Sequence, residues 1–379
     1  MNSKERVKTT VNHVEPDRVP VGEWGIDHDH VSKIIGRHTY WRNRKDSTLA
    51  LWDGRRDEVV ESMKEDYAEL ISKLDYDLIT VELVPPKGFE HPDPPKQVDA
   101  KTWKDSKGNV FRYSASNDSI VCVTSSTPVE SLSDNEIAKQ KKNAGNIDPT
   151  QFELIDYIAD KFGDEKAIVC RSIDVYGGLM NPFGGGEEHK LILPLTAPEE
   201  IKKMYEPVLE RNKKIIEHCS RKGVLIGMQG KDFCMNTGSF MNPEVLRDVY
   251  FPFMKMVNDE LYAQDMIPFF HCCGKTWDII DDFIQVGYKG YQSIQESAGM
   301  DPEKMKREYG DKLTLWTGVQ CETLINGTRE EVEKEVSRYL DICMPDGGFI
   351  FGSTNSVQYG ANTDNYLRAL EIVREKGIY

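Results

Sequence analysis

The sequence predicts an α/β fold, a (β/α)8 TIM barrel, on three observations. Short apolar segments with strand character alternate with helical patterns along the chain, which is typical of a parallel sheet covered by helices. Several of these segments, such as VLIGM and LTLWTGV, are nearly continuous apolar runs, as expected of strands that are buried on both faces. The chain has 379 residues, which one large barrel with an insertion can fill as a single domain, 1–379.

Eight strands and at least three long helical stretches follow from these patterns. Apolar residues at three- and four-residue spacing predict helices over 199–221 and 328–343, and Asn242-Pro243-Glu244 begins another that is expected to run toward Glu260. A doubly wound open sheet is the alternative, but no Gly-x-Gly-x-x-Gly follows the first strand. The expected strands are 19–25, 77–83, 168–174, 224–229, 267–272, 290–295, 313–319 and 348–352.

One polar stretch, 94–130, breaks the alternation after the second strand. Its residues 105–109, Asp-Ser-Lys-Gly-Asn, predict the turn of a β-hairpin between short strands. We therefore expect an inserted hairpin, which serves either as a lid or partner contact or as a surface decoration.

Composition excludes several classes of partner. The formal net charge is −15, which argues against binding to nucleic acid or to an anionic membrane surface. The first 13 residues have no apolar core, and the chain has no run of 18 apolar residues, so neither a signal peptide nor a membrane span is expected. The eight cysteines are then expected to stay reduced in the cytoplasm, where they are candidates for metal binding or catalysis. A homodimer is one of the oligomeric states that the sequence leaves open.

The run 267–274, IPFFHCCG, predicts a metal site at the end of a strand. Side chains alternate along a strand, so His271 and Cys273 share one face while Cys272 points to the other. Zn²⁺ prefers nitrogen and sulfur ligands, which an imidazole and a thiolate supply. Packing of a buried cysteine and a strand-end histidine in the core is the alternative interpretation.

Polar residues also follow the other predicted strands, at the barrel end where catalytic groups lie in this fold. Cys321 is the soft candidate for a third metal ligand, and Glu82 or Asp232 could serve as an acid or as an oxygen ligand. His271 is both a metal-ligand and a catalytic candidate. The candidates for substrate binding are Glu23, Trp24, Asp174, Tyr176, Gln229 and Asn355.

The C-terminal half resembles the uroporphyrinogen decarboxylase superfamily. The resemblance rests on HCCG, on the segment from GYQSIQESAGMDPEKM to LTLWTGVQCETLINGTREEVEKEV, on PDGGFIFGS and on Asp364-Asn365, and the opening VNHVEPDRVPV looks like the superfamily's N-terminal segment. It implies the (β/α)8 fold and one of two activities. These are decarboxylation of a porphyrinogen and corrinoid-dependent methyl transfer.

Departures from the superfamily's patterns narrow the expected activity. The decarboxylases carry an arginine-rich segment soon after the Arg-x-Pro stretch, whereas Arg18-Val19-Pro20 is followed by GEWGIDHDH. The thiol methyltransferases resemble this chain in the His-x-Cys of His271 and Cys273, but their third zinc ligand is a cysteine in the final strand-end loop, where this chain has Ser353 to Ser356. The closer resemblance is to the bacterial methyl-donor components that cleave aryl methyl ethers.

The resemblance therefore implies an enzyme of the anaerobic O-demethylase type that moves a methyl group from a small-molecule donor to Co(I). It implies two cofactors, Zn²⁺ and a corrinoid (cobalamin), the latter on a separate carrier protein. The alternatives are a zinc thiol methyltransferase that demethylates a methyl-corrinoid protein, a decarboxylase, and a non-catalytic barrel that binds a corrinoid or tetrapyrrole.

Overall fold

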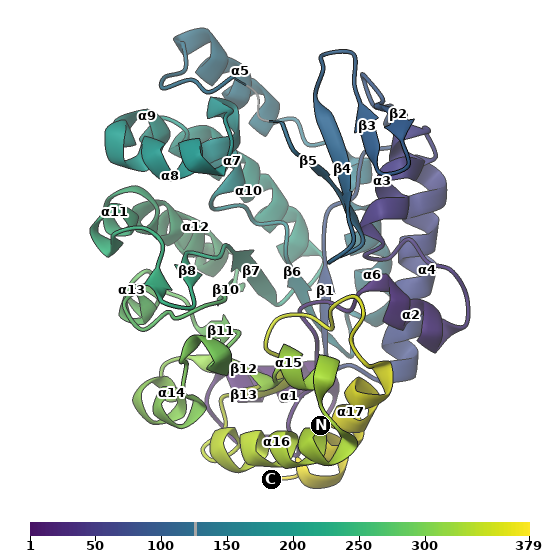
Figure 1. Ribbon diagram of the computed structural model, residues 1–379. Helices are drawn as coiled ribbons and strands as arrows, with labels where there is room; N and C mark the ends of the chain where they lie inside the picture. Colours follow the sequence, from purple (N-terminus) through teal and green to yellow (C-terminus); the bar gives the residue numbers. More distant parts are fainter. Residues whose placement is uncertain (125–126) are drawn as a thin grey trace.

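The computed structural model describes residues 1–124 and 127–379, and its centre is a curled sheet of seven parallel strands (Figure 1). The strands follow one another around the sheet in chain order, without the reversal that marks a doubly wound sheet. Each coincides with one of the predicted strands. In order around the sheet they are β1 (Leu78–Val81), β6 (Ala167–Cys170), β7 (Ile226–Gly230), β10 (Ile267–His271), β11 (Gly290–Gln292), β12 (Thr314–Val319) and β13 (Phe349–Ser353).

The remaining predicted strand, 19–25, is a bridging segment rather than a regular strand. It makes isolated parallel bridges to both edge strands, Gly22 to Leu78 of β1 and Val21 to Phe351 of β13. The peptide N–H of Gly22 donates to Phe351 O (3.0 Å), and Phe351 N–H donates to Pro20 O (2.9 Å). Pro20 has no N–H to donate, which limits the length of a regular ladder at this position. The segment therefore lies between β13 and β1, where an eighth strand was predicted.

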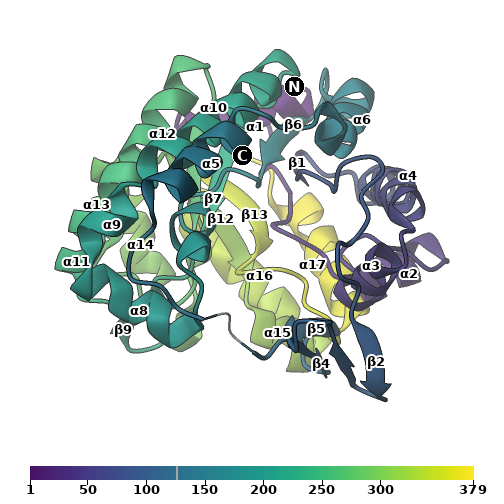
Figure 2. The same ribbon diagram turned by 90° about the horizontal axis from the view of Figure 1, so that it is seen from above.

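Helices surround the sheet, as the view from above shows (Figure 2). The predicted helix 328–343 is α16, which begins with a capping box between Thr328 and Glu331. The two other predicted helices are each divided in two, the second of them at Tyr250, just ahead of Pro252. The helices are α1 (Ser3–Val11), α2 (His28–Ile35), α3 (Arg44–Trp52), α4 (Arg56–Leu74), α5 (Asp134–Ala144), α6 (Glu153–Phe162), α7 (Gly177–Met180), α8 (Glu187–Thr196), α9 (Pro198–Lys202), α10 (Tyr205–Arg221), α11 (Pro243–Val249), α12 (Phe251–Ala263), α13 (Ile280–Gln285), α14 (Pro302–Tyr309), α15 (Cys321–Asn326), α16 (Arg329–Cys343) and α17 (Thr363–Lys376).

Alternation along the strands divides the buried side chains between two cores. Phe269 and Met228 belong to a small inner cluster that α1 also enters through Val7 and Val11. Phe270, the next residue on β10, belongs instead to the large cluster between the sheet and the helices. The sheet is thus buried on both faces, as its continuous apolar runs predict. Over the described ranges, no helix combines the length and the apolar character that crossing a bilayer requires.

The predicted insertion contains a four-stranded antiparallel sheet rather than a single hairpin, and its residues 125 and 126 lie outside the described ranges. The strands are β2 (Lys96–Asp99), β3 (Thr102–Lys104), β4 (Val110–Ser114) and β5 (Ser119–Cys122). The predicted turn, 105–109, joins β3 to β4. Trp52 of α3 packs on Trp103 and Phe111, with ring centroids 6.2 and 5.4 Å away. This sheet stands at the end of the molecule away from the two chain termini (Figure 1).

Candidate functional site

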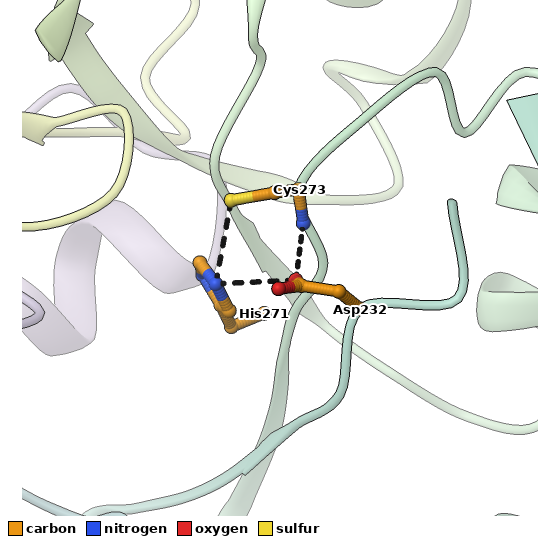
Figure 3. Close-up of side chains that lie close together, drawn as sticks. All are labelled: Asp232, His271 and Cys273. Atoms are coloured by element: carbon orange, nitrogen blue, oxygen red, sulfur yellow. Dashed lines mark hydrogen bonds and ion pairs between the residues drawn. The ribbon is translucent and has the colours of Figure 1, made fainter. Parts of the chain in front are cut away.

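Three potential ligand atoms meet at the carboxyl end of β10 (Figure 3). His271 is the last residue of β10, Cys273 follows two residues later, and Asp232 comes from the loop after β7. His271 Nε2 lies 3.6 Å from Cys273 Sγ and 3.6 Å from Asp232 Oδ1, and the peptide N–H of Cys273 donates to Asp232 Oδ1 (2.8 Å). The sequence separates Asp232 from His271, but β7 and β10 pair in parallel and end at the same edge.

The spacing of these atoms fits a zinc ion. Ligands about 2.0 to 2.3 Å from a tetrahedral Zn²⁺ lie roughly 3.3 to 3.8 Å from one another. Both separations measured from His271 Nε2, 3.6 Å, fall in this range. Three protein ligands leave the fourth coordination position open, which is the arrangement of catalytic rather than structural zinc sites. The chemistry of the donor set, one nitrogen, one sulfur and one oxygen, suits the same metal.

A second layer of contacts orients the imidazole of His271. Its Nδ1 is hydrogen-bonded to Gln292 Oε1, so Nδ1 carries the proton and Nε2 presents a lone pair to the cluster. The amide of Gln292 is itself held by donation to Ser353 O (2.8 Å). The Trp24 ring stacks on the imidazole, with ring centroids 4.8 Å apart and an angle of 7°. Burial lowers the pKa of His271 although Asp232 opposes it, which keeps the neutral form that binds metals.

The thiol of Cys273 is held in place by an amide. Asn355 Nδ2 donates to Cys273 Sγ (3.0 Å), a contact that suits a sulfur carrying negative charge. Burial, reinforced by Asp232, raises the pKa of Cys273 to about 12, so the thiolate requires a cation beside it. Zn²⁺ deprotonates a coordinating thiol. The environment of Cys273 therefore also fits a metal ligand.

Cys321, the predicted third ligand, lies close to the cluster but outside it. Its Sγ contacts Thr354 Oγ1 (3.6 Å) and Ser356 O (3.7 Å). It lines a cavity of about 230 Å³ together with Cys273 and Asn355. Among the described residues, Asp232 and not Cys321 brings its donor atom within 4.8 Å of both other ligand atoms. Asp232, predicted as an acid or oxygen ligand, is therefore the third member of the cluster.

Glu82, predicted as a catalytic acid, forms an ion pair with Arg171. Burial alone would raise the pKa of Glu82, but the guanidinium groups of Arg171 and Arg42 hold it below its ordinary value. A carboxyl group with a lowered pKa is ionised at neutral pH and is a poor proton donor. The contact suits a role in holding Arg171 in position.

Glu23 is a buried carboxyl group that faces the end of β13. The N–H and the hydroxyl of Ser353 donate to its two oxygens, at 2.9 and 2.7 Å. Burial raises the pKa of Glu23 to about 8 despite these hydrogen bonds. The structure places Glu23 beside Trp24, but it is Trp24 and not Glu23 that contacts the imidazole of His271.

Stability should fall with rising pH because of Glu23. Its folded-state pKa lies above its ordinary value of 4.5, so the folded protein binds the extra proton and the stabilisation is complete below pH 4.5. It is lost as the pH rises through about 8. Glu23→Gln, which stays neutral, should flatten the decrease in unfolding free energy between pH 5 and pH 8 in urea titrations. Parallel pH profiles for the two proteins would contradict this assignment.

Asp174 and Tyr176, two predicted substrate-binding residues, lie at the start of α7. The carboxylate of Asp174 accepts the peptide N–H groups of Tyr176, Gly177 and Gly178, at 2.9, 2.7 and 2.6 Å. Asp174 also lines a cavity of about 440 Å³ at the carboxyl ends of the strands. The ring of Tyr176 has Lys231 Nζ above it at 4.0 Å. Asp174 thus secures the start of a helix beside this cavity.

Gln229, the remaining substrate-binding candidate, lies between the sheet and the helices. Its Nε2 donates to Asn258 Oδ1 of α12 (2.6 Å), and Tyr288 donates to its Oε1 (2.5 Å). Its side chain is fully buried. The structure therefore does not bring Gln229 to the cluster.

Sequence reasoning did not single out Gln292 or the arginines of the larger cavity. Gln292 is a polar residue inside the apolar strand β11, and it pairs in register with His271, which was the available signal. Arg171 directly follows the apolar strand β6, so it could have been found by the same search for polar residues at strand ends. Arg42 and Arg44 precede or begin α3, and no sequence pattern links them to β6.

A curled parallel sheet with a cluster of polar, potentially metal-binding side chains at the carboxyl ends of its strands is typical of enzymes with a TIM-barrel-like fold. A sequence model of the family described as uroporphyrinogen decarboxylase (URO-D) matches residues 184–376, which is half of the chain and includes the whole cluster. The chain belongs to this family. Curated proteins include no sequence that matches it.

Solved structures resemble the chain in fold. A methyltransferase from Methanosarcina mazei superposes with a TM-score of 0.68 at 14% sequence identity, covering 99% of each chain. A xylose isomerase-like TIM barrel protein from Mycobacterium smegmatis gives a TM-score of 0.35 at 12% identity over 62% of this chain and 80% of that one. Of these two likenesses, the first is high enough to describe the fold, which is shared over 99% of both chains.

Proposed function

We propose that this chain is a methyltransferase that moves a methyl group from a small methylated donor, an aryl methyl ether, to the Co(I) corrinoid of a carrier protein. The observation that carries the proposal is the cluster of Asp232, His271 and Cys273, which fits a catalytic zinc ion at the mouth of a URO-D-family barrel. The full-length likeness to a methyltransferase in fold supports the same class of reaction.

The reaction needs electrophilic assistance at the ether oxygen. The methyl–oxygen bond breaks, a cobalt–carbon bond forms, and the departing phenoxide takes a proton. Zn²⁺ held by His271, Cys273 and Asp232 would supply the positive charge that stabilises the departing oxygen. This assistance is effective because the site is partly shielded from water: His271 is buried and Cys273 is half-buried.

The chain's own residues position the groups around the donor. Gln292 and Trp24 fix the imidazole of His271 from its Nδ1 side and from its face. Asn355 holds Cys273 Sγ and lines the two adjoining cavities of about 230 and 440 Å³. A donor in these cavities has its reactive end beside the cluster. Such positioning contributes to the rate because it removes the need to align the reactants.

Anaerobic visible spectroscopy tests this function. Free cobalamin and a corrinoid carrier protein, each reduced to Co(I) with titanium(III) citrate, are mixed with zinc-loaded protein and with methoxybenzoates, methoxyphenols, methanol or methylamines in turn. We expect conversion of Co(I) to methyl-Co(III) with the methoxyarenes only. Conversion of added methyl-Co(III) by thiols, with no reaction in the forward panel, would move the function to the thiol side. Absence of reaction in both directions from a protein with full zinc occupancy would contradict a methyltransferase.

A further inference from the structure

Three arginines line the larger cavity beside the cluster. Arg42 lies just before α3, Arg44 begins α3, and Arg171 follows β6, so the arginines come from two separate parts of the chain. We call this space, of about 440 Å³, the arginine cavity. Its volume is within the range of small-molecule sites. Trp24 and Asn355 also line it, and these residues contact His271 and Cys273 respectively. The arginine cavity and the metal-fitting cluster are therefore neighbours.

The guanidinium groups are held close together despite their like charges. Burial lowers the pKa of Arg42, and Arg171 and Arg44 lower it further, while Asp27 opposes them. The Arg42 side chain is 10% exposed and that of Arg171 is 8% exposed, whereas that of Arg44 is 42% exposed and lies at the open side of the cavity. Holding the two buried guanidinium groups of Arg42 and Arg171 near each other is costly unless anions offset their charge.

The carboxylates of the protein offset this charge only in part. Arg42 Nε donates to Asp27 Oδ1 (2.8 Å), and Arg171 pairs with Glu82. Arg44 lies 3.7 Å from the same oxygen of Asp27 and donates no side-chain hydrogen bond within the described part of the chain. Buried Arg171 Nε likewise has no hydrogen-bond partner there.

Asp174, the other acidic residue that lines the cavity, does not supply the missing acceptor. Its two carboxylate oxygens already accept three peptide N–H groups at the start of α7. The arginine cavity therefore has more donors than acceptors, and an anion would complete it.

We propose that the arginine cavity binds the carboxylate of the methyl donor, so that the substrate is an anionic aryl methyl ether such as a methoxybenzoate. Guanidinium groups present a planar fork that matches a carboxylate and binds it through two hydrogen bonds. With the carboxylate at Arg44 and Arg171, the aromatic ring extends past Trp24 and Asn355 toward Cys273. This inference rests on the proposed methyltransferase function and specifies its substrate.

The arginine cavity is not built from the segment in which the decarboxylases carry their arginines. The segment GEWGIDHDH, which follows Arg18-Val19-Pro20, contains no arginine, and this argued against the decarboxylase activity. The structure instead gathers arginines from α3 and from the end of β6 at the cavity wall. A one-carboxylate ligand fits this arrangement.

Calorimetric titration tests the inference without any corrinoid. We expect 4-methoxybenzoate to bind the zinc-loaded protein at least tenfold more tightly than its neutral isostere 4-methoxybenzamide, because hydrogen bonds to charged groups contribute roughly 10- to 100-fold in affinity. Arg44→Gln should weaken the acid by about tenfold or more and leave the amide unchanged. Arg171→Lys, which keeps the charge but loses the fork, should weaken the acid as well.

Arg307→Gln is the matched control. Arg307 is 66% exposed on α14, away from the arginine cavity, so its loss should leave both affinities unchanged. Equal binding of acid and amide, or an acid affinity that Arg44→Gln does not change, would overturn the inference. Methyl transfer from neutral ethers as fast as from acids would overturn it while preserving the proposed function. Arginine-dependent binding without methyl transfer would preserve the inference and reject the function.

Discussion

His271→Ala is expected to reduce zinc occupancy from stoichiometric to background and to abolish methyl transfer. His271 Nε2 is the atom that lies 3.6 Å from both other donors, so its removal leaves two ligands that cannot hold the metal alone. Loss of a contact that merely orients a ligand costs about 10- to 100-fold in metal affinity, and loss of the ligand should cost more. Zinc is measured by mass spectrometry after dialysis, and transfer by the cobalt spectrum.

A neighbouring pair of cysteines provides the control for this prediction. Cys273→Ala should lose zinc as His271→Ala does, whereas Cys272→Ala should keep it. Cys272 is buried in the large cluster between the sheet and the helices, where its Sγ accepts the peptide N–H of Phe233. Gln292→Leu should weaken zinc about 10- to 100-fold without removing it. Full zinc occupancy in His271→Ala, or equal losses in the two cysteine variants, would show that the metal is held elsewhere.

That His271 and Cys273 lie on the same face of the sheet could be predicted, because it depends only on the local geometry of the strand. Strand alternation puts both on one side, and the structure places Cys272 on the other, in the core between sheet and helices. Alternation does not say which side is the barrel interior. Gln229, also at a strand end, proved to face the helices for this reason, with its amide bonded to Asn258 and Tyr288.

The third donor was harder to predict because it depends on contacts between distant segments. Asp232 and Cys321 both follow predicted strands, and their residue types alone favoured the softer cysteine. The pairing of β7 with β10 puts the loop after β7 beside His271, and this brings Asp232 rather than Cys321 into the cluster. Similarly, seven strands were found in the described residues where the apolar runs predicted them, while the segment around Pro20 could form only bridges.

The last prediction concerns the opposite end of the barrel, where Asp77 joins three segments. Asp77 is fully buried just before β1. Its carboxylate accepts Arg6 Nη1 of α1 (2.7 Å), Arg18 Nη1 and Nη2 (2.6 and 3.0 Å) and the peptide N–H of Val21 (2.9 Å). Asp77→Ala should lower the unfolding free energy by about 3 to 5 kcal/mol, because it leaves the buried Arg6 with only the exposed Asp17 as an anion and leaves the part-buried Arg18 without a carboxylate partner.

Urea unfolding followed by circular dichroism, with EDTA present so that metal binding does not add to stability, measures this loss. Asp17→Ala is the matched control. Asp17 pairs with the same Arg6 but is 44% exposed, so its loss should cost about 1 kcal/mol or less. Equal destabilisation by the two variants would mean that the buried hydrogen bonds of Asp77 do not stabilise the bridging segment, 19–25.

Substitutions at the two ends of the barrel should therefore affect different properties, stability at one end and zinc binding at the other. Asp77 lies at the amino end of β1, whereas His271 ends β10 at its carboxyl end. Carboxyl ends of barrel strands carry the chemistry and amino ends carry stability. At temperatures where it remains folded, Asp77→Ala should bind zinc as the unaltered protein does. His271→Ala should lose zinc, but its unfolding free energy measured in EDTA should change far less than that of Asp77→Ala. A zinc deficit in folded Asp77→Ala would instead show that the bridging segment, 19–25, must be held in place for Trp24 to stack on His271 and for zinc to bind. The three ligand residues alone would then not be sufficient for zinc binding.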